Sequence, residues 1–424
     1  MILSFRVKNF RSFSNDAIIS MRPMRAYKEH EGNIYQHNKN IEILKIAGIY
    51  GPNSSGKSNF IRAIGCMRYI LFDSLRRSSV DEIDAETFEL DVKKKTSPTE
   101  FDVEMLIDNY VYRYGFSVRR DRVIAEWLYR SLGGPRSVVQ TLFIREKDSI
   151  LKADSRLLKE ACQFDMTTLL SNALLLPRLD QLNNIVAKAV MGWFTNLKVL
   201  SGLSSFSYAE YSARHFNDVG FREKMTEIVR LADPSIENIL VDVQRIDIDE
   251  LPQRFRMKLS NEKRRGIVEA STIFVERRNT QGDFVPFELG KKESEGTKKI
   301  FGMSGPLVDI LNSGAILVID ELEAKLHPAL TRKLLSLFQS ERWNPKNAQL
   351  IFVTHDVTLL RYAKLRRDQI WFCEKRKECK SELYCLAEIK SATRARQGDN
   401  IEKRYLEGRY GALPEFTYFG RDNC

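Results

Sequence analysis

The sequence predicts an α/β fold: a mixed, largely parallel sheet with flanking helices, an antiparallel β-subdomain and an inserted, mainly helical lobe. Three observations lead to this prediction. Short apolar runs at 41–50, 314–321 and 349–356 are each followed by polar residues, which is typical of buried parallel strands. Strand-like runs at 101–107, 110–118 and 122–129 are separated by turn residues. Helical spacing of apolar residues dominates from about 155 to 231.

The remaining elements follow from local pattern. Residues 1–10 alternate apolar and polar, which predicts an edge or antiparallel strand, and the spacing of apolar residues after Lys57 predicts a helix. Pro177 interrupts a long helical pattern, so we expect at least two helices there. Strand-like segments at 254–259 and 271–278 follow. Near the end we expect a hairpin, from the runs at 369–375 and 382–389, and then a charged helix.

These patterns divide the 424 residues into an N-terminal half of a head at 1–130, an inserted lobe at 131–285 and a C-terminal half of the head at 286–424. The net charge of +11 permits a polyanionic partner without requiring one. There is no run of about 18 apolar residues, and the first residues lack an apolar signal core. We therefore expect a cytoplasmic protein that does not engage a membrane.

One segment carries a specific chemical signal. Residues 51–58, GPNSSGKS, fit G-x-x-x-x-G-K-[ST] in full, between a predicted strand and a predicted helix. In such a loop backbone N–H groups face phosphate oxygens, and the helix N-terminus adds positive potential. Lys57 would reach the β- and γ-phosphates, and the Ser58 hydroxyl would ligate Mg²⁺. The motif predicts ATP and Mg²⁺ as cofactors, with further nucleotide contacts from Asn53, Ser54, Ser55, Gly56 and Asn59.

Two later strands end in residues that suit the same chemistry. Asp320 and Glu321 follow the apolar run at 314–319, and a buried carboxylate is costly without a cation or a reaction. Asp320 would hold Mg²⁺, and Glu321 would orient or deprotonate the attacking water. His355 follows the next apolar run, where it could sense the γ-phosphate. Taken alone, the acidic pair could be a helix cap and the histidine a hydrogen-bonded loop residue.

The segment at 292–298, KESEGTK, resembles the signature motif of ABC-type ATPases, with Ser294 and Gly296 at the serine and glycine positions. With the phosphate loop, the acidic strand and FVTHD at 352–356, it resembles ABC-type ATPases of the SMC and RecF kind. The opening KNFRSF at 8–13 is similar to that group's N-terminal turn, whose arginine, here Arg11, contacts nucleotide. The glutamine usual in this group after an early strand has no counterpart, since Thr99 to Phe101 stand near its place.

Two further segments narrow the resemblance. DELEAKLHP at 320–328 and YLEGRYGALP at 405–414 resemble AAA-type ATP-binding proteins of prokaryotic defence operons. Related branches are the ATPase subunits of PARIS-type and abortive-infection systems and the ATPase half of OLD-type nucleases. The resemblance covers roughly 1–127 and 287–414. It implies an ABC-type ATPase head that forms a homodimer or a larger assembly, in which Ser294 and Gly296 act in trans on the partner's nucleotide.

The resemblance also implies a function. An ATP-hydrolysing dimeric switch would sense a phage protein or nucleic acid and control a separately encoded effector, such as a TOPRIM or HNH nuclease or another toxin. About 70 residues follow His355, which is short for a TOPRIM lobe. The only D-x-D, at 247–249, is expected to be a solvated loop.

Three alternatives remain open from the sequence. A DNA-binding repair ATPase of RecF or SMC type would use basic runs at 119–122, 263–265 and 361–367 as phosphate contacts. A transporter cassette lacks an evident membrane-coupling segment. A nucleotide-locked scaffold without hydrolysis is disfavoured by Glu321, the residue type that an inactive site often loses.

Overall fold

The computed structural model describes residues 1–134, 137–203, 205–247, 267–389 and 400–414. Their contacts divide the chain into two units. The first unit comprises Met1–Ser201, Ser313–Leu322 and Leu334–Cys424, and the second comprises Gly202–Asn312 and Glu323–Lys333. Residues Ser313–Leu322 are therefore a short return into the first unit between two stretches of the second.

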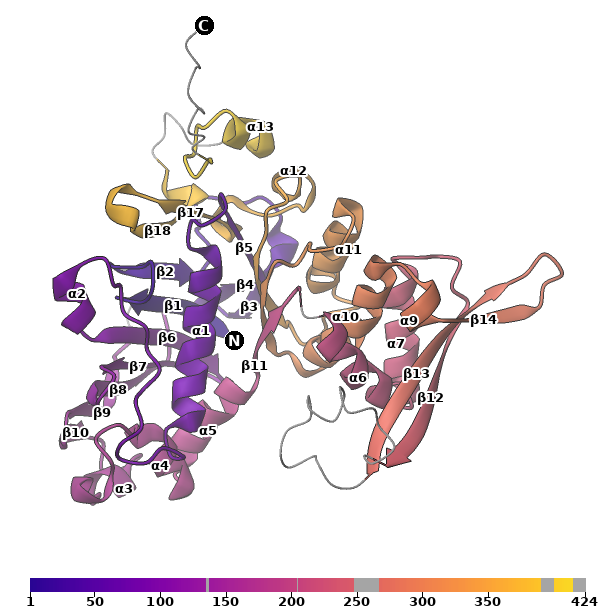
Figure 1. Cartoon of the computed structure of the whole chain (residues 1–424). Helices are drawn as coiled ribbons and strands as arrows, with labels where there is room; N and C mark the ends of the chain where they lie inside the picture. The colour runs from indigo at the N-terminus through magenta and orange to yellow at the C-terminus, as the bar shows by residue number, and fades with distance from the viewer. Residues whose placement is uncertain (135–136, 204, 248–266, 390–399, 415–424) are drawn as a thin grey trace, which may run out of the picture. The chain divides into compact units, whose positions relative to one another are not determined.

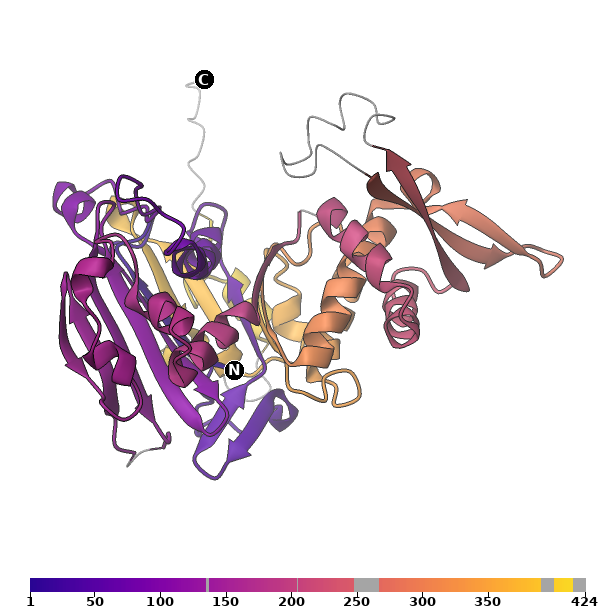
Figure 2. The same cartoon turned by 90° about the horizontal axis from the view of Figure 1, so that it is seen from below.

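A seven-stranded antiparallel sheet forms one layer of the first unit, and Figure 2 shows its long strands side by side. Its order is β10-β9-β8-β7-β6-β1-β2. The three strands predicted between 101 and 129 are confirmed, and β1 is antiparallel as expected, although it lies inside the sheet rather than at an edge. The strands are β1 (Ile2–Lys8), β2 (Ala17–Ser20), β6 (Thr99–Ile107), β7 (Tyr110–Val118), β8 (Val123–Ser131), β9 (Gln140–Glu146) and β10 (Ser149–Ala153).

A six-stranded sheet forms the second layer, in the order β11-β15-β16-β5-β17-β18. Its first five strands are parallel, and β18 is antiparallel to β17, which confirms both the parallel strands and the C-terminal hairpin. The strands are β5 (Ile46–Tyr50), β11 (Leu197–Ser201), β15 (Ile316–Asp320), β16 (Gln349–Val353), β17 (Ile370–Lys375) and β18 (Ser381–Cys385).

The prediction of a single strand at 41–50 is wrong, because this run contains two strands. β4 (Ile41–Leu44) pairs with β3 (Ile34–Asn38), whereas β5 joins the parallel sheet. Lys45 is where the pairing changes. Its N–H donates to Asn33 O, while its carbonyl accepts from Leu350 N at the start of the parallel ladder.

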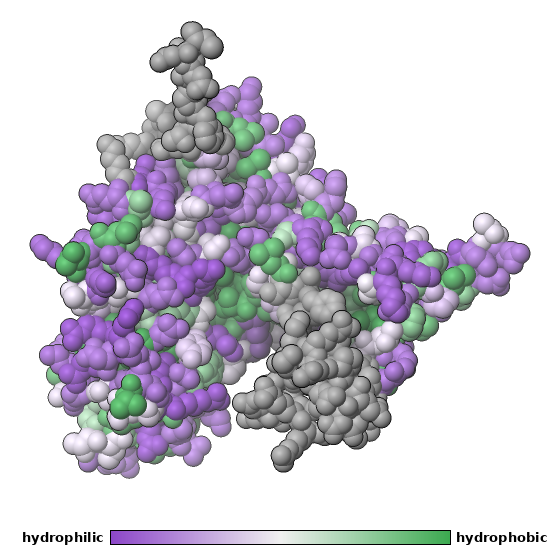
Figure 3. All heavy atoms as spheres, in the orientation of Figure 1, coloured by the Kyte–Doolittle hydropathy of each residue, from purple (hydrophilic) through white to green (hydrophobic). Residues whose placement is uncertain are grey.

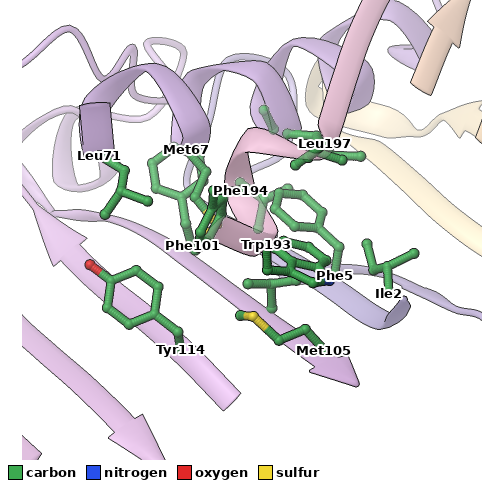
Figure 4. Packing of buried hydrophobic residues seen from close by; sticks show 14 of the residues in the cluster. Ile2, Phe5, Met67, Leu71, Phe101, Met105, Tyr114, Trp193, Phe194 and Leu197 are labelled. Atoms are coloured by element: carbon green, nitrogen blue, oxygen red, sulfur yellow. The ribbon is translucent and has the colours of Figure 1, made fainter. Parts of the chain in front are cut away.

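The helix α1 (Lys57–Asp73) contacts strands of both sheets, β1 of the antiparallel sheet and β11, β15 and β16 of the parallel sheet. Its apolar residues face a continuous core, part of which Figure 4 shows around Phe5, Phe101 and Phe194. Burial of this apolar surface from both sides is the main stabilising contribution to the helix. The predicted helix after Lys57 is confirmed.

Two helices occupy the pattern that Pro177 interrupts, α4 (Leu175–Gln181) and α5 (Ile185–Thr195). Pro177 does not separate them. It lies in the first turn of α4, where its missing N–H has no helical partner to lose. The break falls at Asn184, whose side chain caps α5 by accepting from Val186 N and Ala187 N.

The start of α4 is fixed by a buried carboxylate from the antiparallel sheet. Glu126 on β8 accepts hydrogen bonds from Leu175 N at 2.6 Å and Leu176 N at 2.9 Å. The Tyr114 hydroxyl also donates to Glu126, and Arg145 lies 3.4 Å away. Burial raises the pKa of Glu126, and the two N–H groups and Arg145 oppose that shift. This contact attaches the start of α4 to the antiparallel sheet.

The second unit contains helices and a three-stranded antiparallel sheet in the order β12-β13-β14. The range 131–285 is therefore not the mainly helical lobe that was expected. The strands β9 and β10 extend the antiparallel sheet beyond β8, and β11 extends the parallel sheet beyond β15. The elements are α6 (Ser205–His215), α7 (Val219–Arg230), β12 (Asn238–Asp247), β13 (Ile267–Arg278), β14 (Phe284–Glu288), α9 (Leu289–Lys292) and most of α10 (Glu295–Ser313).

Two sequence predictions concern the gap between β12 and β13. The strand expected at 254–259 and Asp249 lie outside the described residues. Asp247 ends strand β12 instead of lying in a loop, because this residue still pairs with Ile267. The segment 271–278 is strand as predicted, within β13.

The remaining elements are short, apart from α11 (Pro328–Gln339), which spans the boundary between the units. The charged C-terminal helix is present as α13 (Ile401–Leu406). Of the helices in the described part of the chain, none combines the length and apolar character needed to cross a bilayer. On the face drawn in Figure 3, hydrophilic residues dominate and hydrophobic ones are scattered. The short elements not yet named are the helices α2 (Val92–Thr96), α3 (Lys159–Cys162) and α12 (Leu359–Tyr362), and 3₁₀ turns at Glu31–Asn33, Met166–Thr168, Arg367–Gln369, Lys377–Cys379 and Leu386–Glu388.

Candidate nucleotide-binding site

The phosphate loop, residues 51–58, joins the C-terminal end of β5 to α1. Two of its positions accept only glycine. Gly51 has φ 149°, and a Cβ there would collide with the backbone carbonyl oxygen of Cys373. Gly56 has φ 111°, and a Cβ there would collide with Ser381 Oγ and lie 2.8 Å from Ser12 Oγ. Both glycines thus allow a close approach between the loop and other strands.

Lys57 is almost fully buried at the first position of α1. Its Nζ donates to Gly51 O at 2.8 Å and to Pro52 O at 2.7 Å. The ammonium group is therefore held over the loop by carbonyl groups of that loop, and a phosphate oxygen would compete with them for it. Asn53 and Ser54 are exposed on the same loop, with Ser54 in the left-handed region at φ 61°.

The loop is supported from two distant parts of the chain. Ser381 Oγ donates to Ser55 O at 2.6 Å, and Cys373 Sγ lies 3.3 Å from the same oxygen. Burial raises the pKa of Cys373 to about 12, so its thiol stays protonated and can donate. On the other side Asn59 Nδ2 donates to Ser12 Oγ at 2.9 Å. The Asn59 amide, predicted to contact nucleotide, here fixes the N-terminal turn to α1.

The acidic strand end lies at the same edge of the sheet as the phosphate loop. β15, β16 and β5 are adjacent and parallel, and Thr354 N donates to Ile49 O just where β16 ends. The carboxyl ends of parallel strands meet at one edge, so Asp320, His355 and the loop share it. Asp320 Oδ1 is buried and has no hydrogen-bond partner among the described residues. A buried carboxylate oxygen in that condition suits a cation or an ordered water.

The residues at this edge fit a Mg²⁺ ion of the kind held mainly by substrate phosphates. No group of three or more His, Cys, Asp or Glu side chains gathers into a metal site within the described ranges. Mg²⁺ in nucleotide sites needs only one or two protein carboxylates and keeps water and phosphate oxygens as its other ligands. Asp320 and the half-buried Ser58 would be the two protein ligands, and that role stays a prediction.

Glu321 and His355 are placed by backbone geometry at the two strand ends. Glu321 comes immediately after β15 and has φ 52°, in the left-handed region that residues other than glycine rarely adopt. His355 is exposed and follows the buried Thr354. The neighbouring Asp356 accepts from Thr358 N at 3.0 Å and Thr358 Oγ1 at 2.6 Å, which makes it a turn-forming residue.

Arg11 is held in place by Glu86. It has φ 48°, its N–H donates to Glu86 O, and its guanidinium pairs with the Glu86 carboxylate. The next residue, Ser12, touches the phosphate loop, so Arg11 lies beside the loop in the same unit. Thr99, which stands near the place of the missing glutamine, is buried and donates to Asn9 O at 2.8 Å, a structural contact.

The signature turn, residues 294–297, belongs to the second unit and begins α10. Ser294 Oγ accepts from Thr297 N at 3.1 Å and lies 2.9 Å from Thr297 Oγ1, which is an N-cap interaction. A Cβ at Gly296 would lie 3.3 Å from Lys325 O. Glu295 also pairs with Lys325, at 3.0 Å. The predicted role of Ser294 and Gly296 across a dimer stays a prediction.

With this geometry in view, comparison with known proteins gives one family. The family described as "AAA domain, putative AbiEii toxin, Type IV TA system" matches residues 46–361. The chain belongs to this family. A search of curated proteins finds no match. The family match and the two sheets around the phosphate loop confirm the predicted α/β class and the predicted AAA affiliation.

Solved structures similar to the AAA domain share little sequence with it. The SMC head domain from Thermotoga maritima is 12% identical, with a TM-score of 0.38, over 91% of this chain and 98% of that chain. A Smc head domain with an extended coiled coil, bound to the C-terminal domain of ScpA and derived from Pyrococcus furiosus, gives 13%, 0.36, 91% and 96%. The recombination mediator protein RecF with ATP gives 14%, 0.32, 84% and 93%.

Several residues that shape the site of the AAA domain were not found from the sequence. Ser12, Glu86, Cys373 and Ser381 contact the loop or its neighbours, yet no spacing in the sequence relates them to it. The two loop glycines were the available signal, because a glycine at a close approach requires another chain segment nearby. That signal does not say which segment it is.

Proposed function

We propose that this AAA domain binds and hydrolyses ATP with Mg²⁺. The observation that carries the proposal is the shared sheet edge: the phosphate loop follows β5, the unpartnered buried Asp320 oxygen lies at the end of β15, and β16 alone separates these two parallel strands. Ser58 and Asp320 would hold the ion, which neutralises phosphate charge when bound. Lys57 would leave its loop carbonyls for the phosphates, and Glu321 would orient the attacking water and accept its proton.

The test of this function separates binding from hydrolysis. Wild-type protein is expected to bind ATP and release phosphate with Mg²⁺ present. Glu321→Gln should bind ATP with similar affinity and lose most hydrolysis, because an amide cannot accept the proton. Lys57→Ala should lose binding itself. Equal hydrolysis by wild type and Glu321→Gln would remove Glu321 from its assigned role.

The same proposal makes the protein a dimeric switch. The chain carries one phosphate loop and one signature turn, so two copies would form two composite sites, with Ser294 and Gly296 acting across the dimer. Mixing tests this arrangement. Lys57→Ala and Gly296→Asp proteins should each be inactive, whereas a mixture should regain hydrolysis, since a mixed dimer contains one intact site. A mixture that stays inactive would contradict composite sites.

We further propose that the switch acts in prokaryotic anti-phage defence and controls a separately encoded nuclease or toxin. The family's description names a toxin of a toxin–antitoxin system, which supports a function in a multi-protein system. Co-purification with the product of the neighbouring gene, with and without ATP, tests the partnership. If expression of this chain alone arrests growth, the toxic activity belongs to the chain itself.

A DNA-binding repair ATPase remains the second candidate, because the chain carries a net charge of +11. Such a protein would bind DNA in an ATP-dependent way, and its affinity would fall steeply as salt rises. A filter-binding titration across salt concentrations separates the two functions. Weak binding that does not depend on ATP favours the defence switch.

A further inference from the structure

The tail segment, residues 400–414, packs against the hairpin β17–β18 through aromatic rings. Tyr405 and Tyr410 are buried, and both stack on Phe372 of β17. The ring centroids of Phe372 and Tyr405 are 5.3 Å apart with an interplanar angle of 7°, and those of Phe372 and Tyr410 are 5.8 Å apart at 25°. The tail segment thus packs on Phe372 through two aromatic stacking contacts.

Hydrogen bonds fix the turn that follows α13. The Tyr384 hydroxyl on β18 donates to Tyr410 O at 2.7 Å, and the Tyr405 hydroxyl donates to Ala412 O at 2.6 Å. Gly411 has φ 72°, and a Cβ there would lie 2.7 Å from the Tyr384 hydroxyl oxygen. The close contact between tail and hairpin therefore requires glycine at this position.

The same hairpin supports the phosphate loop. Cys373, next to Phe372, places its carbonyl against Gly51, and Ser381 at the start of β18 donates to Ser55 O. The ring of Tyr50, the residue before the loop, lies 6.5 Å from that of Phe372. Both rings are fully buried. Because close-packed side chains transmit displacements, a shift of the tail segment would displace the residues that support the loop.

We propose that the tail segment positions the phosphate loop and so sets its affinity for MgATP. Docked on Phe372 and Tyr384 of the hairpin through Tyr405 and Tyr410, it holds the hairpin against Gly51 and Ser55. When it is released, the contacts that support the loop loosen. This inference rests on the proposed ATP-binding function and adds a means of regulation. Because coupling is reciprocal, bound MgATP in turn stabilises the docked tail.

Four variants test the forward direction of this coupling. MgATP affinity, measured by fluorescence titration with a ribose-labelled ATP, should fall at least about tenfold in Gly411→Ala and Tyr405→Ala, within the usual range of coupling effects. Tyr405→Phe keeps the ring stack and should bind within about threefold of wild type. Leu406→Ala, at an exposed position of the same helix, is the matched control and should bind as wild type does.

Limited proteolysis of the wild type tests the reverse direction and requires no variant. Lys403 and Arg409 are exposed in the tail segment, so trypsin can report its opening. MgATP should slow release of the fragment after Arg409 several-fold, as coupling requires. Cleavage at the same rate with bound MgATP, or a folded Gly411→Ala protein with wild-type affinity, would overturn this inference alone. Wild-type protein that binds no MgATP would instead overturn the proposed function.

Discussion

The phosphate loop and the signature turn are both glycine-containing segments at the start of a helix, but they are held in different ways. The phosphate loop is supported by Ser12, Cys373 and Ser381, which lie far from it in the chain. The signature turn is closed by its own residues, Ser294 and Thr297, with Lys325 as its main outside contact.

This difference affects how each segment responds to change. A loop held by distant strands can be altered by movement of those strands, so its affinity is open to regulation. A self-capped turn keeps its shape wherever its unit moves, which suits an element expected to act on a second copy of the chain. Four predictions test this contrast, from the largest expected effect to the smallest.

Gly56→Ala should have the largest effect. The added methyl group would collide with Ser381 Oγ and Ser12 Oγ, and the alanine would have to adopt φ 111°, so the loop must shift. We expect MgATP binding to fall by about a hundredfold or more, consistent with backbone strain and steric overlap of about 3 kcal/mol. Gly296→Ala is the matched control, since its Cβ would lie 3.3 Å from Lys325 O and 3.7 Å from Ser294 Oγ, without the close overlaps found at Gly56. Comparable losses in the two variants, measured by titration, would contradict the contrast.

Ser381→Ala should have a moderate effect on both stability and binding. Among the side-chain donors in the described part of the chain, it leaves the Ser55 carbonyl with the Cys373 thiol, a weak donor. The loss of such a bond costs about 1 kcal/mol, which corresponds to roughly a fivefold weaker affinity for MgATP if the loop carries the change. Urea unfolding and nucleotide titration measure the two quantities. Glu382→Gln, at the exposed neighbouring position, keeps an acceptor for Arg376, so it is the control and should change neither quantity appreciably.

Ser294→Ala should reduce stability without affecting nucleotide binding by a single subunit. Removing an N-cap costs about 1 kcal/mol, and Ser294 belongs to the unit that lacks the phosphate loop. Ser294→Thr retains a hydroxyl and should restore most of the stability. Denaturant unfolding together with titration of the monomer checks both expectations. Weakened binding by the monomer would mean that the signature turn supports the loop of its own chain.

The smallest effect concerns pH. Hydrogen bonds from Lys325 and Lys298 lower the pKa of Glu295. The lowered pKa means that this carboxylate stabilises the folded state above its ordinary value of about 4.5 and loses that contribution as pH falls through the lowered pKa. The melting temperature of wild type should therefore slightly exceed that of Glu295→Gln at pH 7, and the difference should disappear as pH falls through the lowered pKa of Glu295. A constant difference across pH would exclude this ion pair as its cause.

The sequence was most informative where one local segment determines the structure. The phosphate loop, the strands leading to Asp320 and His355, and the helix after Lys57 were predicted because motif and periodicity lie within a few residues. Lys45 was missed because a strand that changes partner keeps its apolar pattern. The hydrogen bond from the Asn59 amide to Ser12 was not predicted, because it depends on folding of distant segments, and the nucleotide contact expected of Asn59 stays a prediction.

The inserted region shows the same limit on a larger scale. Apolar spacing indicated helices between 155 and 231, and helices are present there. Whether a strand such as β11 extends the parallel sheet or belongs to a separate lobe depends on which edge is open in the folded head. Pattern within the strand does not contain that information. Glu126 likewise gave no sign that it caps α4, which begins about 50 residues later.

One feature of the connectivity has a mechanical consequence. The strand β15 lies in the short return Ser313–Leu322, and the chain enters the second unit on both sides of it. Its neighbour β11 also leaves the sheet into the second unit, at Ser201, which is in register with Asp320. The backbone segment that carries Asp320 and Glu321 is thus covalently linked at both ends to the second unit. A force on the second unit is therefore transmitted to these two residues through the backbone itself.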